Sequence, residues 1–257
     1  MSDEYAALLA ELVSTTEAEL LPYTRALYLF GSYQKEEKET GWIIPGQSDI
    51  DLVLVVDLDD PNPDKPQRRL RKISEILSAF LCHPSYSSIL DLSLIEYGDL
   101  PQKIGMTFSP LHLYSAAKGR LVLGKNILND FSYSPKVIKQ SAAVLCYQTY
   151  ENLKASVLNR PIIGTQNLAF ISADCVLEMA HAYLAFKGNL DEVRTHVPDS
   201  FSNLMNDNNN TNVVDTVFEA HKWRLGTQKQ NKGLFIRDSI EFCHTILQNI
   251  RDPFESL

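Results

Sequence analysis

Two aspartates, Asp49 and Asp51, open an apolar run that continues to Val56. Side chains alternate between the two faces of a strand, so both carboxylates project from one face if this run is a strand. Adjacent carboxylates repel each other and are costly to bury, and a divalent cation relieves both costs. Ligands that are all oxygen atoms suit Mg²⁺, which takes the rest of its shell from water and substrate phosphates. The pair therefore predicts a Mg²⁺ site.

A shorter apolar run, from Leu27 to Phe30, precedes this pair and stops at Gly31 and Ser32. Glycine lets a backbone come close to a ligand, and amides at a turn into a helix bind phosphate. A Gly-Ser turn followed by an Asp-x-Asp strand therefore predicts a single site for a metal-bound nucleoside triphosphate.

This arrangement resembles the DNA polymerase β-like nucleotidyltransferase superfamily, whose signature is Gly-Ser, a loop and Asp-x-Asp on the next strand. The matching residues are Gly31, Ser32, Asp49 and Asp51. The chain departs from the family at one position. Where the family has a further glycine, this sequence has Glu36, and Gly41 or Gly46 could take its place.

The family takes a third carboxylate from a neighbouring strand, and the resemblance gives this role to Asp91, which alternates with Leu90, Leu92 and Leu94. The resemblance then implies an enzyme that moves a nucleoside monophosphate from a nucleoside triphosphate such as ATP to an acceptor hydroxyl and releases pyrophosphate. Gly31 and Ser32 would bind the nucleotide. Asp49, Asp51 and Asp91 would be the metal ligands and catalytic residues.

The expected fold class is α+β, with a nucleotidyltransferase palm over residues 1–130 and an all-helical bundle over 131–257. Sequence patterns predict helices at 4–22 and 65–82 and strands at 26–30, 49–56 and 88–96. The stretch 119–128 resembles the segment that closes the palm in many nucleotidyltransferases. From Ser134 onward the strand signals stop, and helices are expected at 135–158, 165–187, 212–225 and 233–250.

The charge and composition of the chain limit the classes of partner that it is expected to bind. A formal net charge of −8 over 257 residues argues against a long nucleic-acid groove and mildly favours a small cationic co-substrate. The sequence shows no signal peptide and no apolar stretch of membrane-spanning length, so a cytoplasmic protein without membrane contact is expected. Four cysteines without CxxC spacing are expected to be reduced core residues rather than zinc ligands.

A palm followed by a bundle, at this length, resembles the aminoglycoside and lincosamide adenylyltransferases, whose bundle supplies half of the pocket for a small-molecule acceptor. Asp174, Glu178 and His181 share one helix face, and the resemblance makes them candidates for acceptor binding. An internal polar network or an exposed stripe would give the same spacing. The base that activates the acceptor could come from this face, from Asp91 or from Glu96.

Other functions stay open at this point. Arg237 and His244 fit the Arg-to-His spacing of the HEPN ribonucleases, whose helical domains cleave RNA by acid–base chemistry. A protein- or RNA-modifying nucleotidyltransferase of the toxin–antitoxin type is a second alternative. A regulatory module whose bundle forms a homodimer is a third. The intact aspartates count against the third, and the fused bundle favours a small-molecule acceptor over the second.

Overall fold

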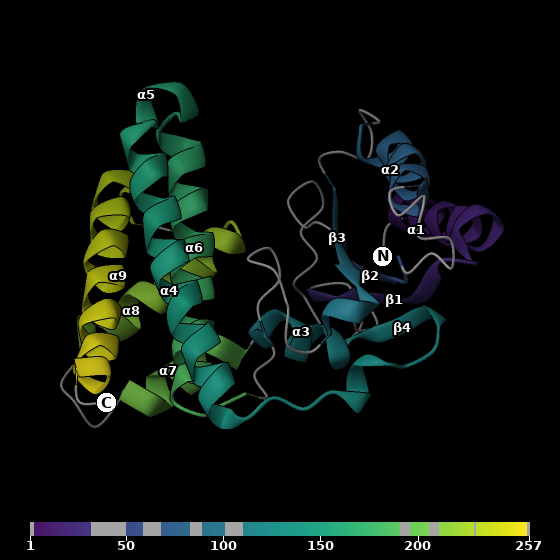
Figure 1. The fold of residues 1–257 in the computed structure, drawn as a ribbon. Coiled ribbons are helices and arrows are strands. Elements are labelled where there is room, and N and C mark those ends of the chain that lie inside the picture. The colour runs from purple at the N-terminus through teal and green to yellow at the C-terminus, as the bar shows by residue number, and fades with distance from the viewer. Residues whose placement is uncertain are drawn as a thin grey trace. The chain divides into compact units, whose positions relative to one another are not determined.

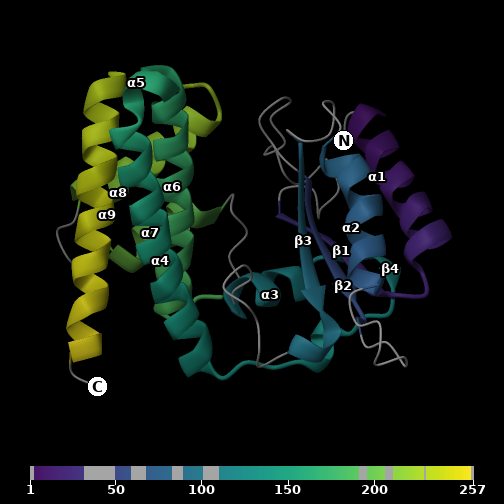
Figure 2. The same ribbon diagram turned by 45° about the horizontal axis from the view of Figure 1, so that its top comes forward.

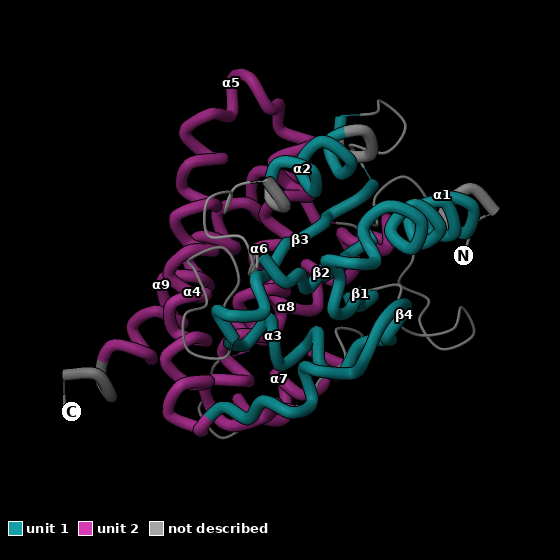
Figure 3. The backbone as a smooth tube through the Cα atoms, turned by 45° about the vertical axis from the view of Figure 1, so that its right-hand side comes forward, with its two compact units in different colours: residues 1–133 teal, residues 134–257 magenta. Residues whose placement is uncertain are grey.

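The structure is a computed structural model that describes residues 3–31, 50–58, 68–82, 89–100, 110–190, 196–205, 211–228 and 230–255. The chain divides into two compact units, residues 1–133 and 134–257, which Figure 3 colours teal and magenta. The first unit is a sheet with flanking helices and the second is entirely helical in its described part. This is the α+β architecture expected from the sequence (Figure 1).

The sheet of the first unit has four strands in the order β3-β2-β1-β4. The strands are β1 (Thr24–Phe30), β2 (Ile50–Val56), β3 (Leu90–Glu96) and β4 (Arg120–Gly124). β1 is antiparallel to both β2 and β4, whereas β2 and β3 are parallel. The sheet is therefore mixed. Its two central strands are β1 and β2, which are the two runs that carry the Gly-Ser and Asp-x-Asp motifs.

Alternation along the strands separates two apolar faces. Leu27 and Leu29 of β1 join Leu52 and Leu54 of β2 in one buried cluster. Two helices cover this face, α1 (Asp3–Thr15) and α2 (Arg68–Leu81), and they lie side by side in Figure 2. α1 runs on into a π-helical turn, Thr16–Leu20, where a single continuous helix was expected.

The opposite face of the sheet holds a second cluster that includes Tyr28, Val53 and Val55. It is covered by α3 (Pro110–Ala117), a helix that the sequence analysis missed. The buried hydroxyl of Tyr28 accepts hydrogen bonds from the amides of Ile127 and Leu128, at 2.8 and 3.1 Å. These bonds attach the segment after β4 to the sheet. Short 3-10 turns lie at Tyr97–Asp99 and Leu128–Asp130.

The second unit contains α4 (Pro135–Leu158), α5 (Arg160–Ile163), α6 (Thr165–Phe186), α7 (Val197–Met205), α8 (Thr211–Arg224) and α9 (Lys232–Glu255). The start of α4 follows from its sequence, because Ser134 caps the helix through the amide of Val137 and Pro135 occupies a first-turn position where no amide is needed. The four long helices occur where periodicity placed them, and the short helices α5 and α7 were not predicted.

α6 packs against α4, α7, α8 and α9 and forms the centre of the helical unit. By length and composition alone α6 could span a membrane, so the expectation that no stretch is long and apolar enough was wrong. However, 72% of its most apolar window is buried inside the structure, as in the central helix of a bundle. Its apolar character is thus accounted for by packing.

Three of the four cysteines, Cys146, Cys175 and Cys243, are buried free thiols in the helical unit, as expected. Burial raises the pKa of the Cys175 thiol to about 12, and the nearby Glu178 carboxylate adds to the increase. A thiol that stays protonated is neither a good nucleophile nor a metal ligand. Cys82 is exposed, so its assignment to the core was wrong.

Candidate active site

Three neighbouring strands bring the candidate site residues into one row. β1 ends at Phe30, whose antiparallel partner on β2 is Asp51, and the parallel partner of Asp51 on β3 is Asp91. Residues paired directly across strands project from the same face of a sheet. The carboxylates of Asp51 and Asp91 therefore leave the sheet on one face, at adjacent positions, beside the end of β1. Asp51 is partly buried and Asp91 is exposed.

This face is the one that α3 covers. Asp51 alternates with Ile50 and Leu52, which point into the cluster beneath α1 and α2, so its carboxylate points the other way. Glu96 has the opposite parity to Asp91 and lies at the far end of β3, five residues or roughly 17 Å along the strand. Of the candidate bases, Glu96 is therefore excluded from the Asp51–Asp91 site by strand geometry.

Gly31 lies directly against Asp51. Its φ is +69°, a conformation that favours glycine, and a Cβ added there would overlap the Oδ2 atom of Asp51. The residue after β1 therefore has to be glycine for two reasons, its backbone conformation and the close approach of the carboxylate. The sequence analysis predicted a glycine that approaches a ligand, and the structure shows one that approaches a carboxylate.

The donor set at this site fits a hard divalent cation. Strands in a sheet lie about 4.8 Å apart, and like charges directly opposite each other on neighbouring strands are destabilising. Carboxylate oxygens are the ligands that Mg²⁺ prefers, and a cation between Asp51 and Asp91 would remove their repulsion. No cluster of three potential metal ligands occurs among the described residues, but Asp49, the third expected ligand, is outside them.

Ser32 and Asp49 both lie in the stretch 32–49, outside the described residues, as do Glu36, Gly41 and Gly46. Their expected roles at the nucleotide and the metal stay predictions. The structure adds that the residues flanking this stretch, Gly31 after β1 and Ile50 at the start of β2, lie at the same end of these two paired strands. Gly31 and Ile50, the described residues that flank this stretch, therefore both lie beside Asp51.

The proposed acceptor face on α6 takes part in interactions within the helical unit. Asp174 accepts a charged hydrogen bond from Arg224 of α8, and Glu178 accepts one from the hydroxyl of Thr149 on α4 at 3.1 Å. The Asp174 side chain is 53% exposed, whereas Arg224 is only 12% exposed. Glu178 and His181 are partly buried. These contacts form polar links between helices of the bundle, with Asp174 at the surface, and they leave the acceptor role untested.

Arg237 and His244 are both exposed on α9. The Arg237 guanidinium donates to Asp238 at 2.7 Å and lies 3.8 Å from a carboxylate oxygen of Glu241. Arg237 lines a groove of about 650 Å³ between α8 and α9, together with four acidic residues, Asp215, Glu219, Asp238 and Glu241. A groove with four acids and one cation among its described residues repels RNA phosphates, which counts against a ribonuclease.

No protein-family model and no curated protein sequence matches the chain. Among solved structures, it is similar to the spectinomycin adenyltransferase AAD(9) from Enterococcus faecialis, crystallised with ATP and spectinomycin. The identity is 14% and the TM-score is 0.58, over 93% of this chain and 99% of that one. The chain therefore has the same fold as that adenyltransferase.

This similarity confirms the expected architecture, a mixed sheet with flanking helices followed by a helical region. An identity of 14% shows the fold and leaves the substrate and the active site of this chain open. The roles suggested for Asp51, Asp91 and Gly31 are therefore supported only by the geometry of this structure.

Helix α3 covers the face of the sheet on which Asp51 and Asp91 lie, and it was not predicted from the sequence. Pro110–Ala117 is short and mostly apolar, so it has no polar face that would reveal a helical period.

Proposed function

We propose that this protein is a Mg²⁺-dependent nucleotidyltransferase that moves a nucleoside monophosphate from ATP, or another nucleoside triphosphate, to a hydroxyl of a small-molecule acceptor. The observation that carries the proposal is the register of Asp51 and Asp91 beside Gly31, within the fold of an enzyme that was crystallised with ATP and spectinomycin. We place the reaction in the cytoplasm, where nucleoside triphosphates are available and cysteines stay reduced.

In this proposal Asp49, Asp51 and Asp91 would hold the metal, which would supply charge neutralisation of the triphosphate and of the leaving pyrophosphate. Gly31 and Ser32 bind the β- and γ-phosphates through their backbone and hydroxyl. The acceptor hydroxyl attacks the α-phosphorus, the bond to pyrophosphate breaks, and the hydroxyl proton passes to a base. Asp91 is the candidate for that base.

A screen of acceptors tests the proposed activity. The protein is incubated with Mg²⁺, each of the four nucleoside triphosphates and one acceptor at a time, and pyrophosphate release is measured. The acceptors are spectinomycin, other aminoglycosides, lincosamides, RNA and proteins. The proposal expects pyrophosphate release with a small hydroxylated molecule and a product heavier by one nucleoside monophosphate. Label transfer only to RNA or protein would favour the toxin–antitoxin alternative instead.

The α6 face makes a separate prediction about the acceptor. If Asp174 and Glu178 bind a cationic acceptor, Asp174→Asn and Glu178→Gln should each lower kcat/KM for the acceptor by about 10- to 150-fold. Each variant loses a hydrogen bond to a charged group, which is worth roughly 1.5–3 kcal/mol. The affinity for the triphosphate should hardly change.

Arg224→Gln is the matched control, since it breaks the Asp174–Arg224 ion pair from the other side. If Asp174 serves only this ion pair, Asp174→Asn and Arg224→Gln should destabilise the fold to a similar extent in thermal unfolding, and neither should change the acceptor KM. That outcome would remove the α6 face from the acceptor site.

A further inference from the structure

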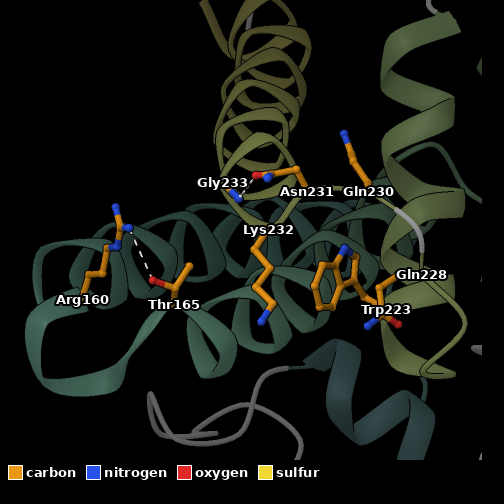
Figure 4. Close-up of a pocket in the computed structure, with 8 residues that line it drawn as sticks. All are labelled: Arg160, Thr165, Trp223, Gln228, Gln230, Asn231, Lys232 and Gly233. Atoms are coloured by element: carbon orange, nitrogen blue, oxygen red, sulfur yellow. Dashed lines mark hydrogen bonds between the residues drawn. The ribbon is translucent and has the colours of Figure 1, made fainter.

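A second cavity lies wholly within the helical unit, at the end of the bundle where α9 begins. It has a volume of about 530 Å³, within the range of pockets that bind small molecules. Figure 4 shows its lining, which comes from α5, the start of α6, the end of α8 and the segment leading into α9. The sequence analysis had assigned no role to any of these residues.

The cavity is electropositive in a protein whose net charge is −8. Arg160 and Lys232 line it, and none of the described residues that line it is an aspartate or a glutamate. The N-terminus of α9, a helix of 24 residues without an acidic residue in its first turn, lies at its edge. A helix N-terminus carries partial positive charge, so the helix and the two cations all favour an anion.

Two buried polar atoms in this lining have no hydrogen-bond partner among the residues that the structure describes. Trp223 is 1% exposed, and its indole Nε1, a donor, is unpaired. In Figure 4 this nitrogen lies on the edge of the ring nearest Gln230 and Asn231, which also line the cavity. The second atom is the buried Oε1 of Gln228. A buried polar group without a partner is costly, so each such group in a folded protein needs an explanation.

Packing does not explain why Trp223 keeps its indole nitrogen at this place. Its ring stacks on Phe235, with centroids 5.4 Å apart, and meets Phe170 edge to face. These ring contacts satisfy the apolar surface of the indole but leave its N–H group unpaired among the described residues. The N–H donor, the two cations and the start of α9 all belong to the lining of one cavity, and this combination suits an oxyanion.

We propose that this cavity is a binding site for a small organic anion. Its phosphate or carboxylate group would accept hydrogen bonds from Trp223 Nε1 and the side chains of Arg160 and Lys232, and a hydroxyl group of the same molecule would donate to Gln228. The volume leaves room for a molecule of the size of a pentose phosphate. The site lies in the helical unit, whereas the proposed triphosphate site belongs to the sheet of the first unit.

Trp223 itself reports on this binding. The chain has two tryptophans, so Trp42→Phe leaves Trp223 as the only indole in the full-length protein. Ribose 5-phosphate, gluconate and neutral ribose are titrated separately at constant ionic strength in EDTA, which prevents metal-dependent triphosphate binding. We expect a saturable change in Trp223 emission with one or both anions and none with ribose. The two anions distinguish a phosphate ligand from a carboxylate ligand.

Variants then test the contacts. Lys232→Gln and Arg160→Gln are each expected to weaken the anion about tenfold, because each removes a charge-assisted hydrogen bond. Lys222→Gln removes the same charge one residue from Trp223 but outside the lining, and should leave the affinity unchanged. Calorimetry with Trp223→Phe measures the loss of the indole donor. If Trp223→Phe does not fold, the effects of Lys232→Gln and Arg160→Gln on anion affinity test the site without it.

Two results would overturn the proposal. The first is no saturable response to either anion up to about 20 mM, a concentration that would reveal even millimolar affinity. The second is binding that Lys222→Gln weakens as much as Lys232→Gln does, since this would show general attraction of anions to the surface and no defined site.

Discussion

Replacing Asp51 by asparagine is expected to lower kcat for nucleotidyl transfer by about a thousandfold or more, while the protein stays folded. Asparagine keeps the size of the side chain and its place opposite Asp91 but removes the negative charge that a divalent cation needs. Loss of one electrostatic contact to the transition state costs about 10²- to 10³-fold in kcat, and here two effects combine, weaker metal binding and weaker phosphate orientation.

The fold of the Asp51→Asn variant should be at least as stable as the native protein without metal, because one of two facing carboxylates is gone. Thermal unfolding in EDTA measures this. Glu75→Gln is the control for loss of a surface acid, since Glu75 is 63% exposed on α2 and pairs with Arg71 of the same helix. Its turnover should equal that of the native enzyme. Normal turnover by Asp51→Asn would remove this residue from the catalytic site.

Replacing Gly31 by alanine is expected to lower kcat/KM for the triphosphate by about 100-fold. A methyl group there overlaps a carboxylate oxygen of Asp51, so that side chain has to move from its position beside Asp91. The positive φ of Gly31 adds a cost of about 1–2 kcal/mol for any residue with a Cβ. The expected loss corresponds to about 2.7 kcal/mol of transition-state stabilisation.

Gly98→Ala is the matched control in the same unit. A Cβ at Gly98 meets nothing within 4 Å, so this change should leave both turnover and stability almost unaltered. Steady-state kinetics with varied triphosphate, together with circular dichroism, separates a damaged site from a damaged fold. Equal kinetics for Gly31→Ala and Gly98→Ala would contradict the packing of Gly31 against Asp51.

The sequence contains enough local information to predict most of this fold. The short apolar runs identify β1 and β2 as strands, and the alternation of side chains along a strand gives the face on which Asp51 lies. The start of α4 is encoded by Ser134 and Pro135, so its first residue was predicted correctly. Short elements such as α7 carry less than three turns of periodic signal, and the π-helical turn after α1 has no distinctive spacing.

Contacts between segments that are far apart in the chain cannot be predicted from local sequence patterns. Asp51 and Asp91 are paired by the register of the parallel strands β2 and β3. Helix α2 connects these two strands along the chain, so their register depends on how α2 packs on the sheet. The ion pair of Asp174 with Arg224 joins residues fifty positions apart. The Glu96 alternative failed because nearness in sequence does not determine which face of a strand a side chain occupies.

The central claim is that Asp51 and Asp91 bind a nucleoside triphosphate through a divalent cation. Titration calorimetry with ATP, in Mg²⁺ and then in EDTA, tests it most directly, using the native protein and an Asp51→Asn/Asp91→Asn variant. We expect the native protein to bind ATP at least about tenfold more tightly in Mg²⁺, a difference of about 1.4 kcal/mol or more, and the variant to lose this difference. Equal affinity with and without Mg²⁺ in the native protein, or an unchanged Mg²⁺ effect in the variant, would contradict the claim.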